Sequence, residues 1–402
     1  MIDIPLLRDS FASTDSKIVM LVVDGLGGAP HPKTKRSELE TANLPNLDRL
    51  AQESACGLTI PVLHGVAPGS GPGHLALFGY DPLKHIIGRG ALEAVGVEGV
   101  DFQEGDVVAR GNFCTVNPDG LLLDRRAGRI SSELSEPLCY ELDKIEVDSI
   151  DIRVYPVKDY RFVLRMRGDG LSHNLTEMDP QRIGVPLQNV KALSIEARAT
   201  AEAANEFVRQ ARQVLMEEER ANMVILRGFS GMPHLPSMAR AYKLNPGAIA
   251  AYPMYRGLAA IVGMKVLPTG STFDDEIETL VERYEEHDFF FIHYKPADAA
   301  GEDGDFDAKV TALEELDRHI PRLLELEPDV LMVVGDHSTP SIMAAHSWHP
   351  VPFLLRSLWT EGEGLETFTE RTCAQGSLGT IGAVNVMPLA LAHSGKLAKF
   401  GA

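Results

Sequence analysis

The sequence predicts an α/β protein in which a largely parallel sheet is sandwiched between helices, with a smaller α+β domain inserted into it. Short β-branched runs alternate with longer amphipathic segments, beginning with IVMLVV at 18–23. The alternation returns in the C-terminal half with FFFIH at 289–293 and VLMVVGD at 330–336. Hydrophobic residues make up 44% of the 402 residues, so the chain can bury a sizeable core.

The core elements can be followed in chain order. After the strand at 18–23 come an amphipathic segment at 44–53 and the apolar run HLALFGY at 74–80. MVILRG at 223–228 resumes the strand pattern, and a helix is expected over 306–326.

The inserted domain is recognised by a change in pattern. From about 108, short strand-like pieces are separated by Gly, Pro and charged turns. The stretch 194–220 is rich in Ala and Glu, carries apolar residues at helical spacing, and closes the insertion. We therefore predict a core domain over 1–107 and 225–402 and an inserted domain over 108–224. The motifs described below predict metal binding in the core domain and a substrate-binding lid in the inserted one.

The charge balance excludes one class of partner. The chain has 38 Lys and Arg against 57 Asp and Glu, a net charge of −19, which repels a nucleic-acid backbone. An anionic substrate would need metal ions or a local arginine cluster to overcome that field.

Cysteine usage and hydropathy indicate the compartment. The four cysteines form no Cys-x-x-Cys pair, so we expect neither a thiolate zinc site nor a disulfide framework, and a reducing cytoplasm fits. The first strong apolar run, 18–23, is too short to span a membrane. A homo-oligomer is the commonest state for a metabolic enzyme of this size.

Acidic residues follow three of the apolar strands. These are Asp24, Asp298 and Asp336; His337 directly follows the last, and His346 comes ten residues later. Strand carboxyl ends line one crevice of an open parallel sheet, so these side chains could converge. One such Asp alone is more often a turn former or helix cap, but three with two histidines favour a site for Mn²⁺, Mg²⁺ or Zn²⁺.

Ser70 lies in a Gly- and Pro-rich turn just before an apolar, helix-like run, within VAPGSGPGHLALFGYDP at 66–82. Such a turn can place a hydroxyl at a helix N-terminus, where backbone N–H groups favour an alkoxide or a phosphate. Taken alone, Ser70 is more often a simple helix cap. A neighbouring metal site favours the nucleophile interpretation, because a metal can deprotonate the hydroxyl.

Several sequence blocks, in this order, carry a family resemblance. They are VVDGLGG at 22–28, GSGPGHLALFGYDP at 69–82, GRGALEAVG at 88–96, DRRAGRI at 124–130, KPADAAGEDGDFDAKV at 295–310, and VVGDHSTP with AHSWHPVPFLL at 333–355. Together they resemble the archaeal-type cofactor-independent phosphoglycerate mutases of the alkaline phosphatase superfamily. The resemblance implies an alkaline-phosphatase-like core, two divalent metal ions and a phosphoserine. It assigns one ion to Asp24, Ser70, Asp336 and His337, and the other to Asp298, Glu302 and His346.

Two positions depart from the family pattern. Relatives usually have His where this chain has Glu302, and Asp with a small residue where it has Gly71 and Pro72. Glu302 lies four residues from Asp298, so both could face one ion, and a carboxylate there favours Mn²⁺ or Mg²⁺ over Zn²⁺ or Co²⁺. The alternative is a solvated Glu302, with His349 or water completing the shell.

Anion recognition is expected from arginines, which grip phosphate and carboxylate bidentately. The densest basic cluster of the insertion is DRRAGRI, from which we predict that Arg125 and Arg129 bind substrate and that Arg126 points outward. The other substrate-binding candidates are Asn112, Arg227, Arg256 and Lys295. His74 could face the site or pack at the base of its helix.

These features lead to a functional hypothesis. The chain is expected to interconvert 3-phosphoglycerate and 2-phosphoglycerate, as in glycolysis and gluconeogenesis, without 2,3-bisphosphoglycerate and through a phosphoserine at Ser70. The alternative is a metal-dependent phosphomonoesterase, or a mutase for another phosphorylated metabolite, since water attacking the same phosphoserine would release phosphate. A metal-binding scaffold without catalysis is a further alternative, which the retained Ser70 argues against.

Overall fold

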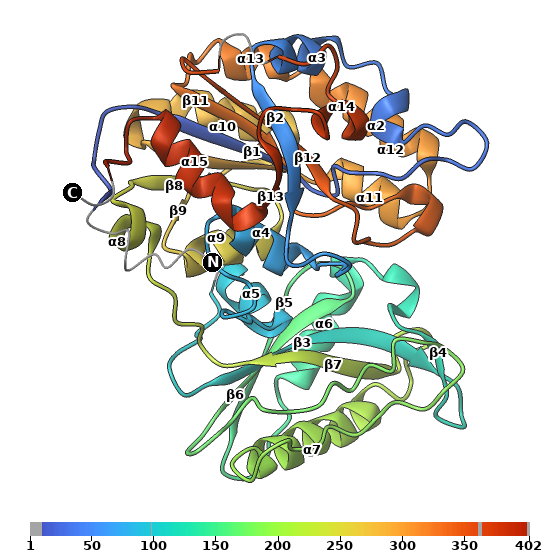
Figure 1. The fold of residues 1–402 in the computed structure, drawn as a ribbon. Coiled ribbons are helices and arrows are strands. Elements are labelled where there is room, and N and C mark those ends of the chain that lie inside the picture. The colour runs from blue at the N-terminus through green and yellow to red at the C-terminus, as the bar shows by residue number, and fades with distance from the viewer. Residues whose placement is uncertain (1–9, 98, 361–363, 400–402) are drawn as a thin grey trace. The chain divides into compact units, whose positions relative to one another are not determined.

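The computed structural model describes residues 10–97, 99–360 and 364–399. The chain forms two compact units (Figure 1). One comprises Met1–Ile86 with Leu235–Ala402, and the other Ile87–His234. We call them the core unit and the inserted unit.

The core unit is built on an eight-stranded sheet with the order β13-β2-β12-β11-β1-β10-β8-β9. Its strands are β1 (Ile18–Val23), β2 (Ala55–Ile60), β8 (Pro246–Ile249), β9 (Lys265–Val266), β10 (Phe289–Tyr294), β11 (Val330–Val334), β12 (Val351–Ser357) and β13 (Gly379–Gly382). β12 runs antiparallel to both neighbours, and every other pairing is parallel. The predicted α/β class with a largely parallel sheet is confirmed.

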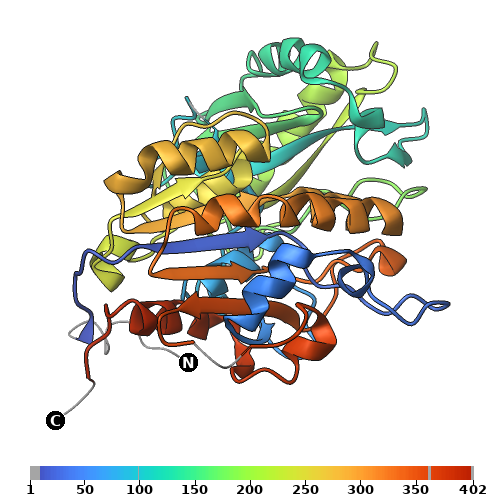
Figure 2. The same cartoon turned by 90° about the horizontal axis from the view of Figure 1, so that it is seen from above.

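The strands at the centre of this sheet are apolar because helices cover both of their faces. Every residue of β1 is buried, as expected for a parallel strand between two helical layers. Figure 2 shows β1 in blue beside strands from the orange C-terminal half, and its register pairs it with β10 and β11.

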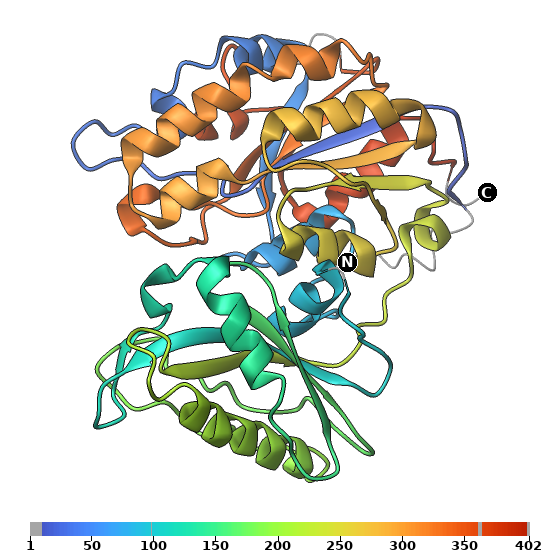
Figure 3. The ribbon, with the colours of Figure 1, turned by 180° about the vertical axis from the view of Figure 1, so that it is seen from behind.

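The helices of the core unit form two layers, seen from opposite sides in Figures 1 and 3. One apolar cluster joins the sheet to α3 (Pro45–Gln52), α10 (Phe273–Arg283), α12 (Phe306–Asp317) and α13 (Ile320–Leu324). The remaining helices are α2 (Glu38–Thr41), α4 (Ser70–Leu77), α8 (Met238–Tyr242), α9 (Pro253–Ile261), α11 (Pro296–Glu302), α14 (Glu370–Cys373) and α15 (Val386–His393). α4 packs through Phe78, just past its end, against Phe291 of β10, with ring centroids 5.1 Å apart.

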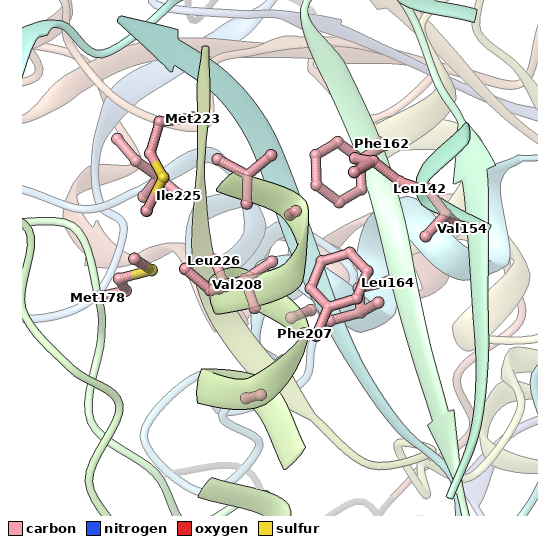
Figure 4. Packing of buried hydrophobic residues seen from close by; sticks show 14 of the residues in the cluster. Leu142, Val154, Phe162, Leu164, Met178, Phe207, Val208, Met223, Ile225 and Leu226 are labelled. Carbon is pink, nitrogen blue, oxygen red and sulfur yellow. The ribbon is translucent and has the colours of Figure 1, made fainter. Parts of the chain in front are cut away.

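The inserted unit is an antiparallel sheet with helices. Its strands are β3 (Val107–Val116), β4 (Leu122–Asp124), β5 (Asp151–Pro156), β6 (Arg161–Arg167) and β7 (Met223–Ser230), and its helices are α5 (Arg89–Gly96), α6 (Ser132–Leu142) and α7 (Arg198–Val214). The apolar face of α7 packs onto the sheet through Phe207, which lies near Phe162 and Leu164 of β6 (Figure 4). This cluster is separate from that of the core unit.

The limits of the inserted unit differ from the predicted 108–224. α5 belongs to it because a Cβ at Gly90 would lie 2.6 Å from the Gly228 carbonyl oxygen and 2.7 Å from that of Val108. β7 was expected to resume the core sheet, but it pairs antiparallel with β3. Strand-like sequence alone does not say which sheet a strand joins, so the limits move to 87 and 234.

None of the helices in the described part of the chain combines the length and the apolar character that crossing a bilayer requires.

Candidate metal centre and active site

Three aspartates gather at one edge of the core sheet. Asp24 directly follows β1, Asp336 follows β11 after one glycine, and Asp298 lies on α11, which follows β10. β1 pairs in parallel with both β10 and β11, so the carboxyl ends of the three strands meet at the same edge. All three side chains are buried.

His337 is the centre of the first side-chain group. Its Nε2 lies 3.2 Å from Asp24 Oδ1, 3.1 Å from Asp336 Oδ2 and 3.2 Å from Ser70 Oγ. Asp24, Asp336 and His337 offer ligand atoms within 4.8 Å of one another. The structure therefore brings together the four side chains that the family resemblance assigned to one ion.

The second group consists of Asp298, His346 and, again, His337. His346 Nε2 lies 3.6 Å from Asp298 Oδ1 and 3.5 Å from Glu302 Oε1. The rings of His337 and His346 stack, with centroids 3.6 Å apart. The family resemblance placed His337 in one group only, whereas the structure places it in both.

Glu302 stands at the border of the second group. Its side chain is half exposed, although it approaches His346. His349, the alternative ligand, has its Nδ1 2.9 Å from Ser347 Oγ. Glu302 thus lies beside the second group, and its role as a metal ligand stays a prediction.

The donor atoms fit divalent cations. Asp24 Oδ1 and Asp336 Oδ2 are buried, and they lie 3.2 Å and 3.1 Å from the same nitrogen, His337 Nε2. One imidazole N–H cannot satisfy two buried carboxylates, and a buried carboxylate is costly unless a cation or a charged partner neutralises it. Oxygen and imidazole donors without thiolates match Mn²⁺, Mg²⁺ or Zn²⁺.

Electrostatics keep two of these carboxylates ionised. Burial acts to raise the pKa of Asp24, but the charge of Lys295 and the hydrogen bonds of His293 and His337 outweigh it, so that pKa lies well below its ordinary value. The pKa of Asp336 is also lowered, because His337 and His74 outweigh burial and the charge of Asp24. Burial raises the pKa of Asp298.

Lys295 lies within this cluster of carboxylates. Its Nζ donates to Asp24 Oδ2 at 2.9 Å and also to Asp298. The side chain therefore links an acid of the first group to an acid of the second. Its predicted contact with substrate stays a prediction.

Ser70 is the first residue of α4 and is buried. The helix approaches the metal-ligand loop closely, since a Cβ at Gly73 would lie 2.2 Å from the Asp336 carbonyl oxygen. His74, one turn on, has its Nδ1 2.8 Å from the Ser70 carbonyl oxygen and 3.2 Å from Asp336 Oδ2. Both alternatives for His74 therefore apply, because its Nδ1 faces the site while its ring packs against Phe78 and Phe291, with centroids 6.1 Å and 5.7 Å away.

Two supporting side chains escaped the sequence analysis. The Tyr255 hydroxyl donates to Asp24 Oδ2, and its ring stacks on His293 with centroids 3.7 Å apart. His293 Nε2 lies 3.4 Å from the same carboxylate oxygen. The only signal in the sequence was a polar residue inside the apolar strand FFFIH.

The inserted unit carries a cluster of arginines. Arg125 donates to both carboxylate oxygens of Asp179, at 3.0 and 2.7 Å, and Arg227 Nη1 lies 3.5 Å from the second. Arg110, on β3, is directly opposite Arg227 in the register with β7. Two like charges facing each other across a sheet are unfavourable, and the carboxylates of Asp179 and Glu93 offset part of this repulsion.

The pKa values of two arginines in this cluster are lowered. Burial lowers the pKa of Arg110 to about 10, with the charges of Arg161 and Arg89 adding to the shift and Glu93 opposing it. Burial lowers the pKa of Arg227 to about 9, with the charges of Arg110 and Arg89 adding to the shift and Asp179 opposing it. Arg110 Nη1 lies 3.3 Å from Glu93 Oε1, and its Nε donates to Asn112 at 3.3 Å.

The remaining substrate-binding candidates lie elsewhere. Arg126 and Arg129 are exposed, as expected for Arg126. Arg256 is on α9 of the core unit and is not part of the arginine cluster. Arg110 and Glu93 were missed because only the strand register brings Arg110 opposite Arg227.

A mostly parallel α/β sheet with a buried carboxylate and imidazole centre, facing a serine at a helix N-terminus, defines a class of protein built to bind divalent cations. Comparison with known proteins is more specific. The chain belongs to the 2,3-bisphosphoglycerate-independent phosphoglycerate mutase family, whose model matches residues 51–221. The resemblance inferred from the sequence blocks is confirmed.

Curated relatives match over nearly the whole chain. A probable 2,3-bisphosphoglycerate-independent phosphoglycerate mutase of Thermotoga neapolitana is 50% identical, with 97% of each chain covered. One from Thermus thermophilus is 47% identical, with 99% of each chain covered.

Solved structures agree on the fold. A protein from Pyrococcus horikoshii matches with a TM-score of 0.82 at 27% identity, covering 96% of this chain and 99% of that one. A cofactor-independent phosphoglycerate mutase from Thermoplasma acidophilum matches with a TM-score of 0.66 at 27% identity, covering 94% of this chain and 100% of that one.

Proposed function

We propose that this chain interconverts 3-phosphoglycerate and 2-phosphoglycerate without 2,3-bisphosphoglycerate. The observation that carries the proposal is the position of Ser70, at the N-terminus of α4 with its Oγ 3.2 Å from His337 Nε2. The names of the curated relatives support the same activity.

Two divalent ions complete the proposed site. Asp24, Ser70, Asp336 and His337 would hold one, and Asp298, Glu302 and His346 the other, with His337 beside both. When bound, such ions lower the pKa of a serine hydroxyl and neutralise phosphoryl oxygens. The carboxylate at 302 favours Mn²⁺ or Mg²⁺, and Zn²⁺ or Co²⁺ remain compatible with the donor set.

Ser70 is the proposed nucleophile. Its Oγ attacks phosphorus in line, the bond from phosphorus to the substrate oxygen breaks, and phosphoserine and glycerate result. The N-terminal N–H groups of α4 stabilise negative charge on this serine. Glycerate then presents its other hydroxyl, which takes the phosphoryl group back from Ser70.

The arginine cluster is the proposed binding site for the substrate carboxylate. Arg110 and Arg227 stand opposite each other in the strand register, with one carboxylate near each, Glu93 at 3.3 Å and Asp179 at 3.5 Å, whereas Arg125 is engaged by both oxygens of Asp179. We also assign Asn112 and Arg129 to this function, and Arg256 and Lys295 of the core unit to contacts with the phosphoryl group. A lid over the bound glycerate would exclude water and suppress hydrolysis of the phosphoserine.

We place this activity in glycolysis and gluconeogenesis in the cytoplasm. All four cysteines are free and buried, which suits a reducing compartment.

The first prediction tests the activity and the nucleophile together. Chain reconstituted with Mn²⁺ should convert 3-phosphoglycerate in an enolase-coupled assay without bisphosphoglycerate, and Ser70→Ala should abolish turnover. Ser54→Ala is the matched control, because this buried serine only donates to the Leu50 carbonyl oxygen at 2.7 Å.

Two outcomes would contradict the proposal. No turnover with Mn²⁺, Mg²⁺, Co²⁺ or Zn²⁺ would exclude the mutase activity, and phosphate release without 2-phosphoglycerate would identify a phosphomonoesterase. Turnover retained in Ser70→Ala would exclude this serine as the nucleophile.

A further inference from the structure

Lys309 is a fully buried lysine on α12. Its Nζ donates three hydrogen bonds, to the carbonyl oxygens of Gly25 at 2.9 Å, Gly27 at 3.0 Å and Thr339 at 2.8 Å. An ammonium group has three N–H donors, so every donor of this side chain binds a backbone carbonyl.

The three carbonyls belong to two loops that carry metal-ligand candidates. Gly25 and Gly27 follow Asp24, and Thr339 lies two residues beyond His337. The loops also contact each other directly, because Thr339 N donates to the Gly27 carbonyl oxygen at 3.0 Å and Gly25 N to Asp336 Oδ1 at 3.2 Å. Lys309 is therefore hydrogen-bonded to both loops.

The third acid of the site is attached to the same assembly. Thr339 Oγ1 donates to Asp298 Oδ1 at 2.6 Å. A Cβ at Gly301, on the helix that carries Asp298, would lie 2.4 Å from the Thr339 carbonyl oxygen, the same atom that Lys309 binds. One ammonium group is thus connected to the segments that hold Asp24, Asp298 and Asp336.

Burying a charged side chain costs free energy that burying an apolar side chain does not. Burial lowers the pKa of Lys309, and the carboxylates of Glu38 and Glu370 act in the opposite direction. Well-packed apolar residues usually stabilise a fold as well as a buried charge does or better. The geometry of the three bonds therefore points to a role beyond packing.

We propose that Lys309 is a positioning residue for the metal centre, holding the loops after β1 and β11 so that Asp24, Asp336 and His337 converge on divalent cations. This inference rests on the proposed metal centre. It does not depend on which reaction that centre performs.

Lys396 provides a matched control. It is also fully buried, and its Nζ donates to the Thr14 carbonyl oxygen at 2.6 Å and lies 3.3 Å from Asp288 Oδ2. Thr14 precedes β1 and Asp288 precedes β10, so both partners lie at the amino ends of these parallel strands, opposite the edge that carries the metal-ligand candidates. Replacing either lysine by Met removes hydrogen-bond donors from its oxygen partners, so both variants should lose thermal stability.

The experiment measures binding of Mn²⁺ alone by isothermal titration calorimetry, on the full chain, at a temperature where circular dichroism shows each variant folded. Lys309→Met should weaken Mn²⁺ binding by about 10- to 100-fold, the usual range for a partner that orients metal ligands. Lys396→Met should bind Mn²⁺ within about 2-fold of the unmodified chain. The electron paramagnetic resonance spectrum of bound Mn²⁺ should change in Lys309→Met only.

Should Lys309→Met fail to fold, Lys309→Gln keeps amide donors and should show a smaller loss of affinity. Unchanged Mn²⁺ binding by a folded Lys309 variant would overturn the proposal, and so would an equal loss in Lys396→Met. An unmodified chain that binds Mn²⁺ but does not isomerise phosphoglycerate would refute the proposed reaction and leave this role standing. A chain that binds no divalent cation would refute both.

Discussion

At the scale of single residues, function and stability make opposite demands on the arginine pair. Arg110 and Arg227 face each other across β3 and β7, where like charges repel. Stability alone would favour a neutral residue at one of these positions. Binding of an anionic substrate would explain why both arginines are present.

Replacing Arg227 by Met should separate the two effects. We expect KM for phosphoglycerate to rise about 10- to 100-fold, from the loss of a charge-assisted hydrogen bond, while thermal stability stays equal or increases. Steady-state kinetics and calorimetric melting measure both. Arg209→Met is the control, because Arg209 is exposed and pairs with Glu206. Unchanged kinetics in Arg227→Met would show that this side chain does not touch the substrate.

Glu276 is a residue whose ionisation should oppose folding. It is buried on α10, with Oε1 accepting from Ala251 N at 2.8 Å and Oε2 without a partner. Burial raises its pKa from 4.5 to about 8, against the opposing effect of backbone N–H groups. The folded chain therefore keeps a proton that the unfolded chain releases between these two values.

This contribution to stability is complete below pH 4.5 and is lost as pH rises through 8. The loss should amount to roughly 3 to 5 kcal/mol, at about 1.4 kcal/mol per pH unit. The free energy of unfolding is measured in urea at pH 5 and pH 9. Glu276→Gln should lack the decrease between these pH values that comes from Glu276. Glu278→Gln, on the exposed side of the same helix, should behave like the unmodified chain. Equal pH dependence in the two variants would contradict the assignment.

At the scale of elements, the approach of α4 to the Asp336 loop determines where Ser70 lies. Only a residue without a side chain fits at 73, since a Cβ there would meet the Asp336 carbonyl oxygen at 2.2 Å and its carbonyl carbon at 2.8 Å. The helix must otherwise move away, and Ser70 would move with it.

We therefore expect Gly73→Ala to destabilise the chain and abolish turnover, although Ala is the better helix former by about 1 kcal/mol. Gly69→Ala is the control: its φ is −84° and its Cβ would meet only Pro72 Cδ, at 3.8 Å. Melting temperature and turnover measure the pair. Equal behaviour of the two variants would mean that the helix has more room than the structure shows.

At the scale of the whole molecule, the two units have separate apolar cores, and the metal-ligand candidates all lie in one of them. Cation binding should therefore stabilise the core unit directly. Mn²⁺ at 100 times its dissociation constant should add about 2.7 kcal/mol per site, and a chelator should remove it. Differential scanning calorimetry with and without chelator checks this. A melting temperature that Mn²⁺ does not change would contradict the proposed metal centre.

The sequence by itself determined the fold class, the family and the main metal-ligand candidates. The apolar runs before Asp24, Asp298 and Asp336 show where buried strands lie and where they end, because both properties depend on neighbouring residues in the chain. A parallel sheet then brings the ends of such strands to one edge. The serine before the apolar run of α4 could be recognised for the same reason, because a helix start has a local signature.

Only the tertiary structure decided which partners these residues meet. The position of His337 between both groups, the stacking of Tyr255 on His293, the Arg110 and Arg227 pair and the three bonds of Lys309 all join residues from distant segments. The limits of the inserted unit belong here too, since β7 resembles a core strand in sequence. Periodicity shows which face of an element is buried, whereas the identity of its neighbour follows from strand order and register.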